Sequence, residues 1–69
     1  MLSRVHIERT SDGVSRTALF RSRSEAIRLV MRINREGWGL RYLRREDHAV
    51  RQPGERVVRG AEDVLQGRA

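Results

Sequence analysis

A segment with helical signals at both ends lies in the middle of the chain. Ser22 and Glu25 have the spacing of a capping box, in which the serine hydroxyl accepts a hydrogen bond from a main-chain amide and the glutamate reaches back to the capping residue. The helix should begin near Arg23 and end at Glu36, because Gly37 suits the left-handed conformation that often closes a helix. Alternating apolar and polar residues precede and follow this segment. The chain is therefore expected to adopt an α+β fold.

Apolar residues cover a wide arc of this helix when its positions are placed at about 100° per residue. The arc contains Ala26, Ile27, Leu29, Val30, Met31 and Ile33. One face of a sheet usually covers a narrower arc. We therefore expect part of it to contact the C-terminal segment of the same chain, a second copy in a homodimer, or a partner protein.

Residues 4–20 have the pattern of an N-terminal β-hairpin. Val5 and Ile7 alternate with polar residues, and a similar alternation returns after Val14. Between the two stretches, Asp12-Gly13 favours a tight reversal, because glycine adopts positive φ without steric cost. Two antiparallel strands are predicted here.

A second β-region should follow the central helix. Residues 38–44 alternate again, and the polar Arg45-Glu46-Asp47 favours a turn. Residues 48–52 and 55–59 then flank Pro53-Gly54, a pair that suits the two central positions of a β-turn. The sequence predicts a second hairpin at this point, and two to three antiparallel strands in this half of the chain.

The C-terminal part is short. Gly60 should end the last strand, and residues 61–66 are expected to form a short helix whose stability depends on packing against the rest of the chain. Residues 67–69 should fray. Taken together, residues 1–69 are predicted to form a single small basic domain.

Several classes of function are excluded or disfavoured by composition. The chain has 69 residues and no cysteine, which leaves no disulfide, thiolate zinc site or thiol nucleophile and little room for a large buried active site. Two histidines are too few for a metal site, and no phosphate-binding loop or nucleophile motif is present. We expect no cofactor and no metal. Without a long apolar run or a secretory leader, a cytoplasmic protein that does not insert into a membrane is expected.

Charge is the strongest indication of function. The formal net charge is +6, and all fifteen basic residues are arginine. Such a chain attracts phosphates through its field and through counterion release, and it attracts acidic protein surfaces as well. One candidate group lies on a single helical face and comprises Arg28, Arg32 and Arg35. The second group is denser and comprises Arg41, Arg44, Arg45, Arg51, Arg56 and Arg59.

The chain has three aromatic residues, and each could either pack in the core or contact a ligand. A domain of this size needs its large rings inside, so Phe20 and Trp38 are expected in the core. Tyr42 is the candidate for stacking on an unpaired base, with burial in the core as the alternative.

From residue 24 onward, the features follow one another in a recognisable order. A helix ends at Gly37-Trp38, a basic strand and His48 follow, and the Pro53-Gly54 turn precedes a last strand and a short helix. This order resembles HicA-type toxins, small ribonucleases with a double-stranded-RNA-binding-like fold. The resemblance implies that His48 is catalytic. The chain departs from the family where Glu46-Asp47 stands in place of Gly-Ser, and its N-terminal hairpin has no counterpart there.

The leading functional hypothesis is a non-enzymatic basic domain that binds DNA or RNA phosphates through arginines. The alternative is an inhibitor that binds a host protein, because short single-domain α+β proteins without enzymatic motifs look like accessory proteins of phages and mobile elements, including anti-CRISPR proteins. The second alternative is a HicA-like mRNA interferase that uses His48.

Overall fold

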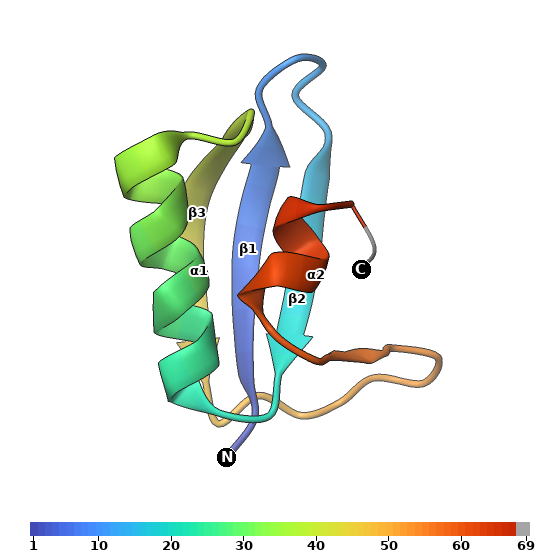
Figure 1. The fold of residues 1–69 in the computed structure, drawn as a ribbon. Helices are drawn as coiled ribbons and strands as arrows, with labels where there is room; N and C mark the ends of the chain where they lie inside the picture. Colours follow the sequence, from blue (N-terminus) through green and yellow to red (C-terminus); the bar gives the residue numbers. More distant parts are fainter. Residues whose placement is uncertain (68–69) are drawn as a thin grey trace.

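The computed structural model describes residues 1–67 and contains a four-stranded sheet with two helices on one of its faces (Figure 1). The elements are β1 (Ser3–Arg9), β2 (Ser15–Phe20), α1 (Arg23–Glu36), β3 (Leu40–Asp47), β4 (Val57–Val58) and α2 (Ala61–Leu65). The strand order across the sheet is β3-β1-β2-β4. This arrangement confirms the expected α+β class and leaves the other face of the sheet without a helix.

The N-terminal hairpin forms as predicted. β1 and β2 pair antiparallel, with Val5 opposite Ala18 and Ile7 opposite Arg16. At the turn, Gly13 has a φ of 73°, and the Asp12 carboxylate accepts a hydrogen bond of 3.1 Å from the amide of Val14. The local turn chemistry therefore fixes the reversal.

Helix α1 has the predicted ends. The Ser22 hydroxyl accepts a hydrogen bond of 3.3 Å from the amide of Glu25, and the amide of Gly37 donates to the carbonyl of Ile33 at 2.8 Å. Gly37 has a φ of 82°, which favours glycine. The Ser22 cap and the closing glycine are therefore confirmed. The reciprocal bond of the capping box is not found in the described chain, because the Glu25 carboxylate pairs with Arg28 at 2.9 Å.

The predicted second hairpin is wrong. β3 pairs antiparallel with β1, whereas β4 lies at the opposite edge and pairs parallel with β2. The Pro53-Gly54 turn does form, with the amide of Glu55 bonded to the carbonyl of Gln52 at 3.0 Å, but residues 48–56 are not strands. Of these residues only Ala49 is buried. The pairing of β4 with β2 buries Val58 in the core. Because this pairing is parallel and the other two are antiparallel, the sheet is mixed.

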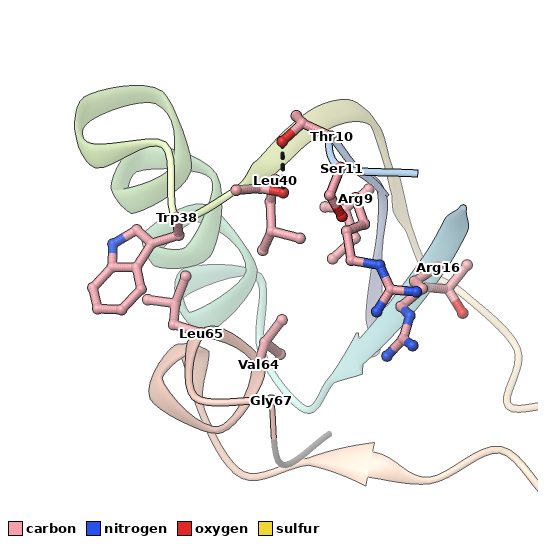
Figure 2. A pocket seen from close by; sticks show the side chains of 12 residues that line it. Arg9, Thr10, Ser11, Arg16, Trp38, Leu40, Val64, Leu65 and Gly67 are labelled. Atoms are coloured by element: carbon pink, nitrogen blue, oxygen red, sulfur yellow. Dashed lines mark hydrogen bonds between the residues drawn. The ribbon is translucent and has the colours of Figure 1, made fainter. Parts of the chain in front are cut away.

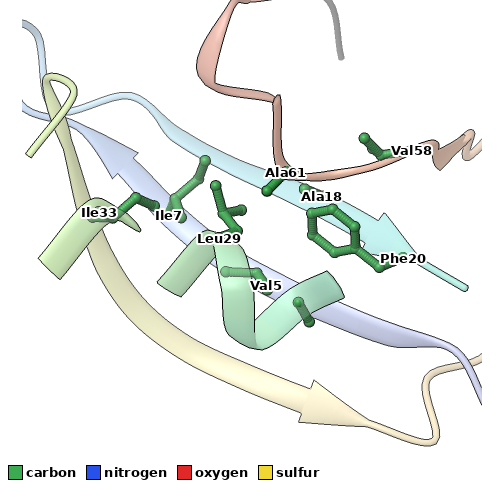
Figure 3. Close-up of a cluster of buried hydrophobic side chains, with 9 residues drawn as sticks. Val5, Ile7, Ala18, Phe20, Leu29, Ile33, Val58 and Ala61 are labelled. Atoms are coloured by element: carbon green, nitrogen blue, oxygen red, sulfur yellow. The ribbon is translucent and has the colours of Figure 1, made fainter. Parts of the chain in front are cut away.

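One apolar core lies between the sheet and the helices (Figure 3). Its buried members are Val5, Ile7, Ala18, Phe20, Ala26, Leu29, Ile33, Val58 and Ala61. Since α2 supplies Ala61 and packs on α1, the C-terminal segment covers part of the wide apolar arc within the chain itself. Met31 stays exposed.

The described helices are short. None within residues 1–67 has the length and apolar character that a membrane-spanning segment needs. The expected fraying at the C-terminus concerns mainly residues 68 and 69, which lie outside the described part of the chain.

Candidate nucleic-acid interface

The polar residues of β1 lie on the face of the sheet that has no helix. Val5 and Ile7 point into the core, so Arg4, His6 and Glu8 lie on the opposite face. The strand registers place Thr17 of β2 and Arg44 of β3 on either side of His6. We call this surface the open face. It has a shallow hollow lined by these three residues together with Ser15, Arg16, Leu43 and Ile7.

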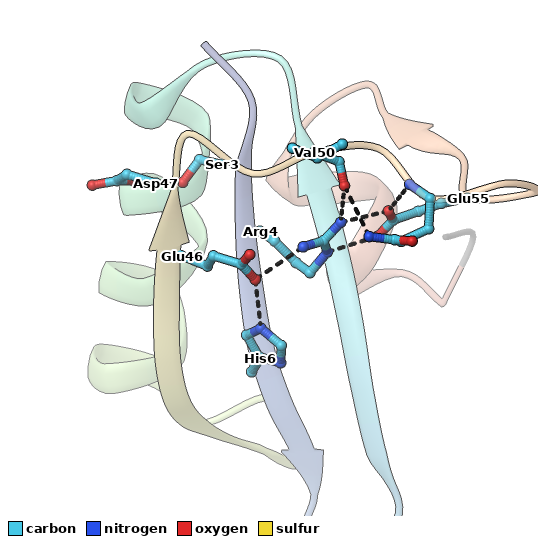
Figure 4. Close-up of polar contacts among 8 residues, drawn as sticks. Ser3, Arg4, His6, Glu46, Asp47, Val50 and Glu55 are labelled. Atoms are coloured by element: carbon cyan, nitrogen blue, oxygen red, sulfur yellow. Dashed lines mark hydrogen bonds and ion pairs between the residues drawn. The ribbon is translucent and has the colours of Figure 1, made fainter.

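Arg4 is the most buried charged residue of the described chain, with 7% of its surface exposed. Its guanidinium donates to both carboxylate oxygens of Glu55, at 2.9 and 2.6 Å, and to Glu46 at 2.9 Å. A further bond of 2.8 Å reaches the carbonyl of Val50 (Figure 4). Because Val50 and Glu55 belong to the segment of residues 48–56, Arg4 fastens that segment over one end of the open face.

The same network shifts the acidity of its carboxyl groups. Hydrogen bonds from Arg4 and from the amide of Gln52 stabilise the charged form of Glu55 and lower its pKa from 4.5 to about 2. The pKa of Glu46 is also lowered, first by Arg4 and then by His6, whose Nε2 lies 3.3 Å from the carboxylate. Both carboxylates are therefore ion-paired with Arg4.

The predicted helical arginine group lies together on α1, but acidic residues neutralise it. Arg28 pairs with Glu25 at 2.9 Å, and Arg35 lies 3.8 Å from Glu36. Arg32 bonds Glu36 at 3.1 Å and Glu62 of α2 at 2.6 Å. The two helices contain four arginines and four acidic residues, so they contribute no net charge.

The second arginine group is not gathered into one patch, because β3 and β4 lie at opposite edges of the sheet. Arg41, Arg44 and Arg45 lie on β3, Arg51 and Arg56 on the segment of residues 48–56, and Arg59 just after β4.

Within the second group, the environments differ. Arg41 pairs with Glu8 at 2.9 Å, and Arg45 pairs with Asp47 at 3.1 Å. Arg51 donates to the main-chain carbonyl of Glu55 at 2.7 Å. Arg44 has no ion pair or hydrogen bond of its side chain within residues 1–67, although it lies on the open face beside His6. It is therefore the most available cation of that face.

Of the two aromatic residues expected in the core, one is buried and the other is exposed. Phe20 is fully buried, as expected. The prediction for Trp38 is wrong: its side chain is 44% exposed, because Gly37, Trp38 and Gly39 all have positive φ and turn the chain at the surface. The indole N–H donates to Glu36, and Arg32 lies 5.5 Å from the ring centre. Tyr42 is partly buried against the core, on the helix side of the sheet.

His48 lies in the turn after β3, where it is exposed and has a φ of 56°. Its side chain has no hydrogen bond or ion pair with any other described residue. The part of the chain that the structure describes contains no cluster of histidine and acidic residues suited to a metal ion.

Sequence reasoning missed the role of Arg4. The alternation of β1 identifies it as a residue of the polar side, but its partners Glu46 and Glu55 are more than forty positions away. Only the tertiary structure brings them together.

No protein-family model, curated protein or solved structure matches this chain in the three comparisons that were made. The resemblance to HicA-type toxins, and the catalytic role that it implies for His48, stay predictions.

Proposed function

We propose that the protein is a non-enzymatic nucleic-acid-binding domain that contacts backbone phosphates through the open face of its sheet. The observation that carries the proposal is the exposed Arg44 on that face. An arginine without an acidic partner offers its full set of donors to a phosphate, whereas a paired one must first give up its carboxylate.

The distribution of charge supports the open face over the helical face. Since the two helices contribute no net charge, the whole +6 belongs to the strands, turns and ends of the chain. On the open face, Glu8, Glu46 and Glu55 are each engaged by an arginine. Within residues 1–67, Arg44 and Arg16 of the hollow have no bonded carboxylate, and Arg51, on the segment that Arg4 binds, donates only to a main-chain carbonyl.

The neighbours of Arg44 suit contacts with a sugar-phosphate backbone. Ser15, Thr17 and His6 line the same hollow and offer hydroxyl and imidazole groups. Hydroxyls commonly bond phosphate oxygens beside arginine. The described aromatic rings do not stand on this face, so the proposal predicts little reading of base sequence.

The test is the salt dependence of binding. Fluorescence anisotropy with short labelled DNA and RNA should show binding that weakens steeply between about 50 and 200 mM salt. Replacing both Arg44 and Arg51 by glutamine should reduce the slope of log K against log salt by about two, since each lost phosphate contact removes about one.

The matched control is the double variant Arg28→Gln and Arg35→Gln. It removes the same charge from exposed, carboxylate-paired positions of α1, and it should leave the slope unchanged. Equal losses in the two double variants would mean that net charge alone drives binding. The absence of binding at low salt would refute the proposal.

The same samples also address the enzymatic alternative. An intact RNA after long incubation agrees with a binding domain, whereas cleavage that is lost in His48→Ala would favour the HicA-like activity.

A further inference from the structure

A cavity of about 320 Å³ lies on the helix side of the sheet. It is bounded by the tip of the β1–β2 hairpin, the turn between α1 and β3, and the end of α2. Its apolar wall is formed by Ile7, Trp38, Leu40, Val64 and Leu65. Cavities of this size and character are typical of sites for small apolar groups.

Two arginines stand on one side of this cavity. Figure 2 shows Arg9 and Arg16 across from Trp38 and Leu65. Arg9 is held by Asp12 at 2.7 Å, which satisfies its charge. Arg16 is exposed and has no side-chain hydrogen bond or ion pair within residues 1–67. An apolar wall facing a cation without a counter-charge fits a ligand that is apolar at one end and anionic at the other.

The strand that carries Arg16 also offers a free edge. β4 pairs only with Leu19 and Phe20, so no strand of the described chain pairs with the outer edge of β2 from Ser15 to Ala18. Arg16 and Thr17 belong to this edge and line the cavity. An extended peptide can add to such an edge by main-chain hydrogen bonds while a side chain fills a neighbouring pocket.

We propose that this cavity binds the C-terminus of a partner polypeptide, with its last apolar side chain against Leu40, Val64 and Leu65 and its carboxylate paired with Arg16. The residues before it would extend along the edge of β2. The cavity shares Ile7, Arg16 and Thr17 with the hollow of the open face, but its apolar wall lies on the helix side of the sheet. The peptide test below uses no nucleic acid, so it can fail or succeed independently of the proposed function.

The fluorescence of Trp38 can measure ligand binding in the cavity. It is the single tryptophan of the chain and lines the cavity, so its emission reports occupation of the site. The probe is an N-acetylated pentapeptide that ends in leucine with a free carboxylate. We expect a saturable change in emission. The same peptide with a C-terminal amide should bind about tenfold more weakly, since it lacks the charged acceptor.

Two matched comparisons complete the test. Arg16→Gln should weaken binding of the free-acid peptide about tenfold. Arg21→Gln should not, because Arg21 is also an exposed arginine but lies beyond the end of β2 and does not line the cavity. A peptide methylated on its main-chain nitrogens should also bind more weakly. Circular dichroism of each variant verifies the fold.

Three results would overturn the inference. The first is an emission that does not change with the free-acid peptide. The second is equal binding of acid and amide, or of the wild type and Arg16→Gln. The third is binding of N-acetyl-leucine as tight as that of the pentapeptide, which would assign the cavity to a small free acid and leave no role for the edge of β2.

Discussion

At the scale of single residues, Arg4 differs from the other described arginines in its burial and in the reach of its contacts. A buried guanidinium is tolerated when carboxylates and carbonyls satisfy its donors. Glu55 does so with both oxygens, and Glu46 and the carbonyl of Val50 complete the set. The network couples the first strand to a segment that has no regular structure, so the position of residues 48–56 depends on a few charged groups.

This network predicts how stability varies with pH. The pKa of Glu55 is about 2 in the folded chain and 4.5 in its ordinary state. Its contribution is therefore complete above the ordinary value and is lost as the pH falls from about 4.5 towards 2. Thermal unfolding followed across this range should show a falling melting temperature.

The variant Glu55→Gln isolates this group from the other carboxyl groups. It should be less stable than the wild type at pH 7, and the difference between the two proteins should shrink as the pH approaches 2. A difference that stays constant over the range would contradict the assignment to Glu55.

At the scale of the elements, α1 and the first hairpin are specified by signals within a few residues of each other. A cap, a closing glycine and the turn between Arg9 and Val14 act through main-chain geometry, which sequence neighbours control directly. The short elements behave differently. β4 and α2 contain two and five residues, and packing against β2 and α1 stabilises them.

The cap of α1 can be tested by substitution. Ser22→Ala removes the side-chain acceptor for the amide of Glu25 and should lower the free energy of unfolding by about 1 kcal/mol. Ser24→Ala is the matched control, because this exposed serine lies inside the helix and alanine favours helix there. Urea denaturation of both variants measures the difference. Equal stabilities would show that the cap has no net effect.

At the scale of the whole molecule, the position of β4 decides the sheet and the distribution of charge. With β4 beside β2, the six arginines of the second group are spread over two edges and a connecting segment. The same placement ends the sheet early along β2 and leaves the free edge beside the cavity. The strand edge that the peptide proposal uses thus follows from this one pairing.

The parallel pairing of β4 gives a prediction at this scale. Val58 is 5% exposed and belongs to the core, while the side chain of Val57 is only partly buried. Val58→Ala should therefore lower the free energy of unfolding by about 2 kcal/mol, through lost apolar burial and a small cavity. Val57→Ala should cost clearly less. The reverse order in chemical denaturation would mean that the other valine faces the core.

The sequence alone determined the class of fold, the first hairpin, the limits of α1 and the basic character of the chain. These depend on hydrogen bonds and steric preferences within a few positions, which neighbouring residues set. Tertiary structure alone decided the order of the strands, the exposure of Trp38, the partners of Arg4 and which arginines lack a carboxylate. In each case, residues far apart in the chain compete for places in the core or for the same carboxylates. A local sequence pattern does not show which of them succeeds.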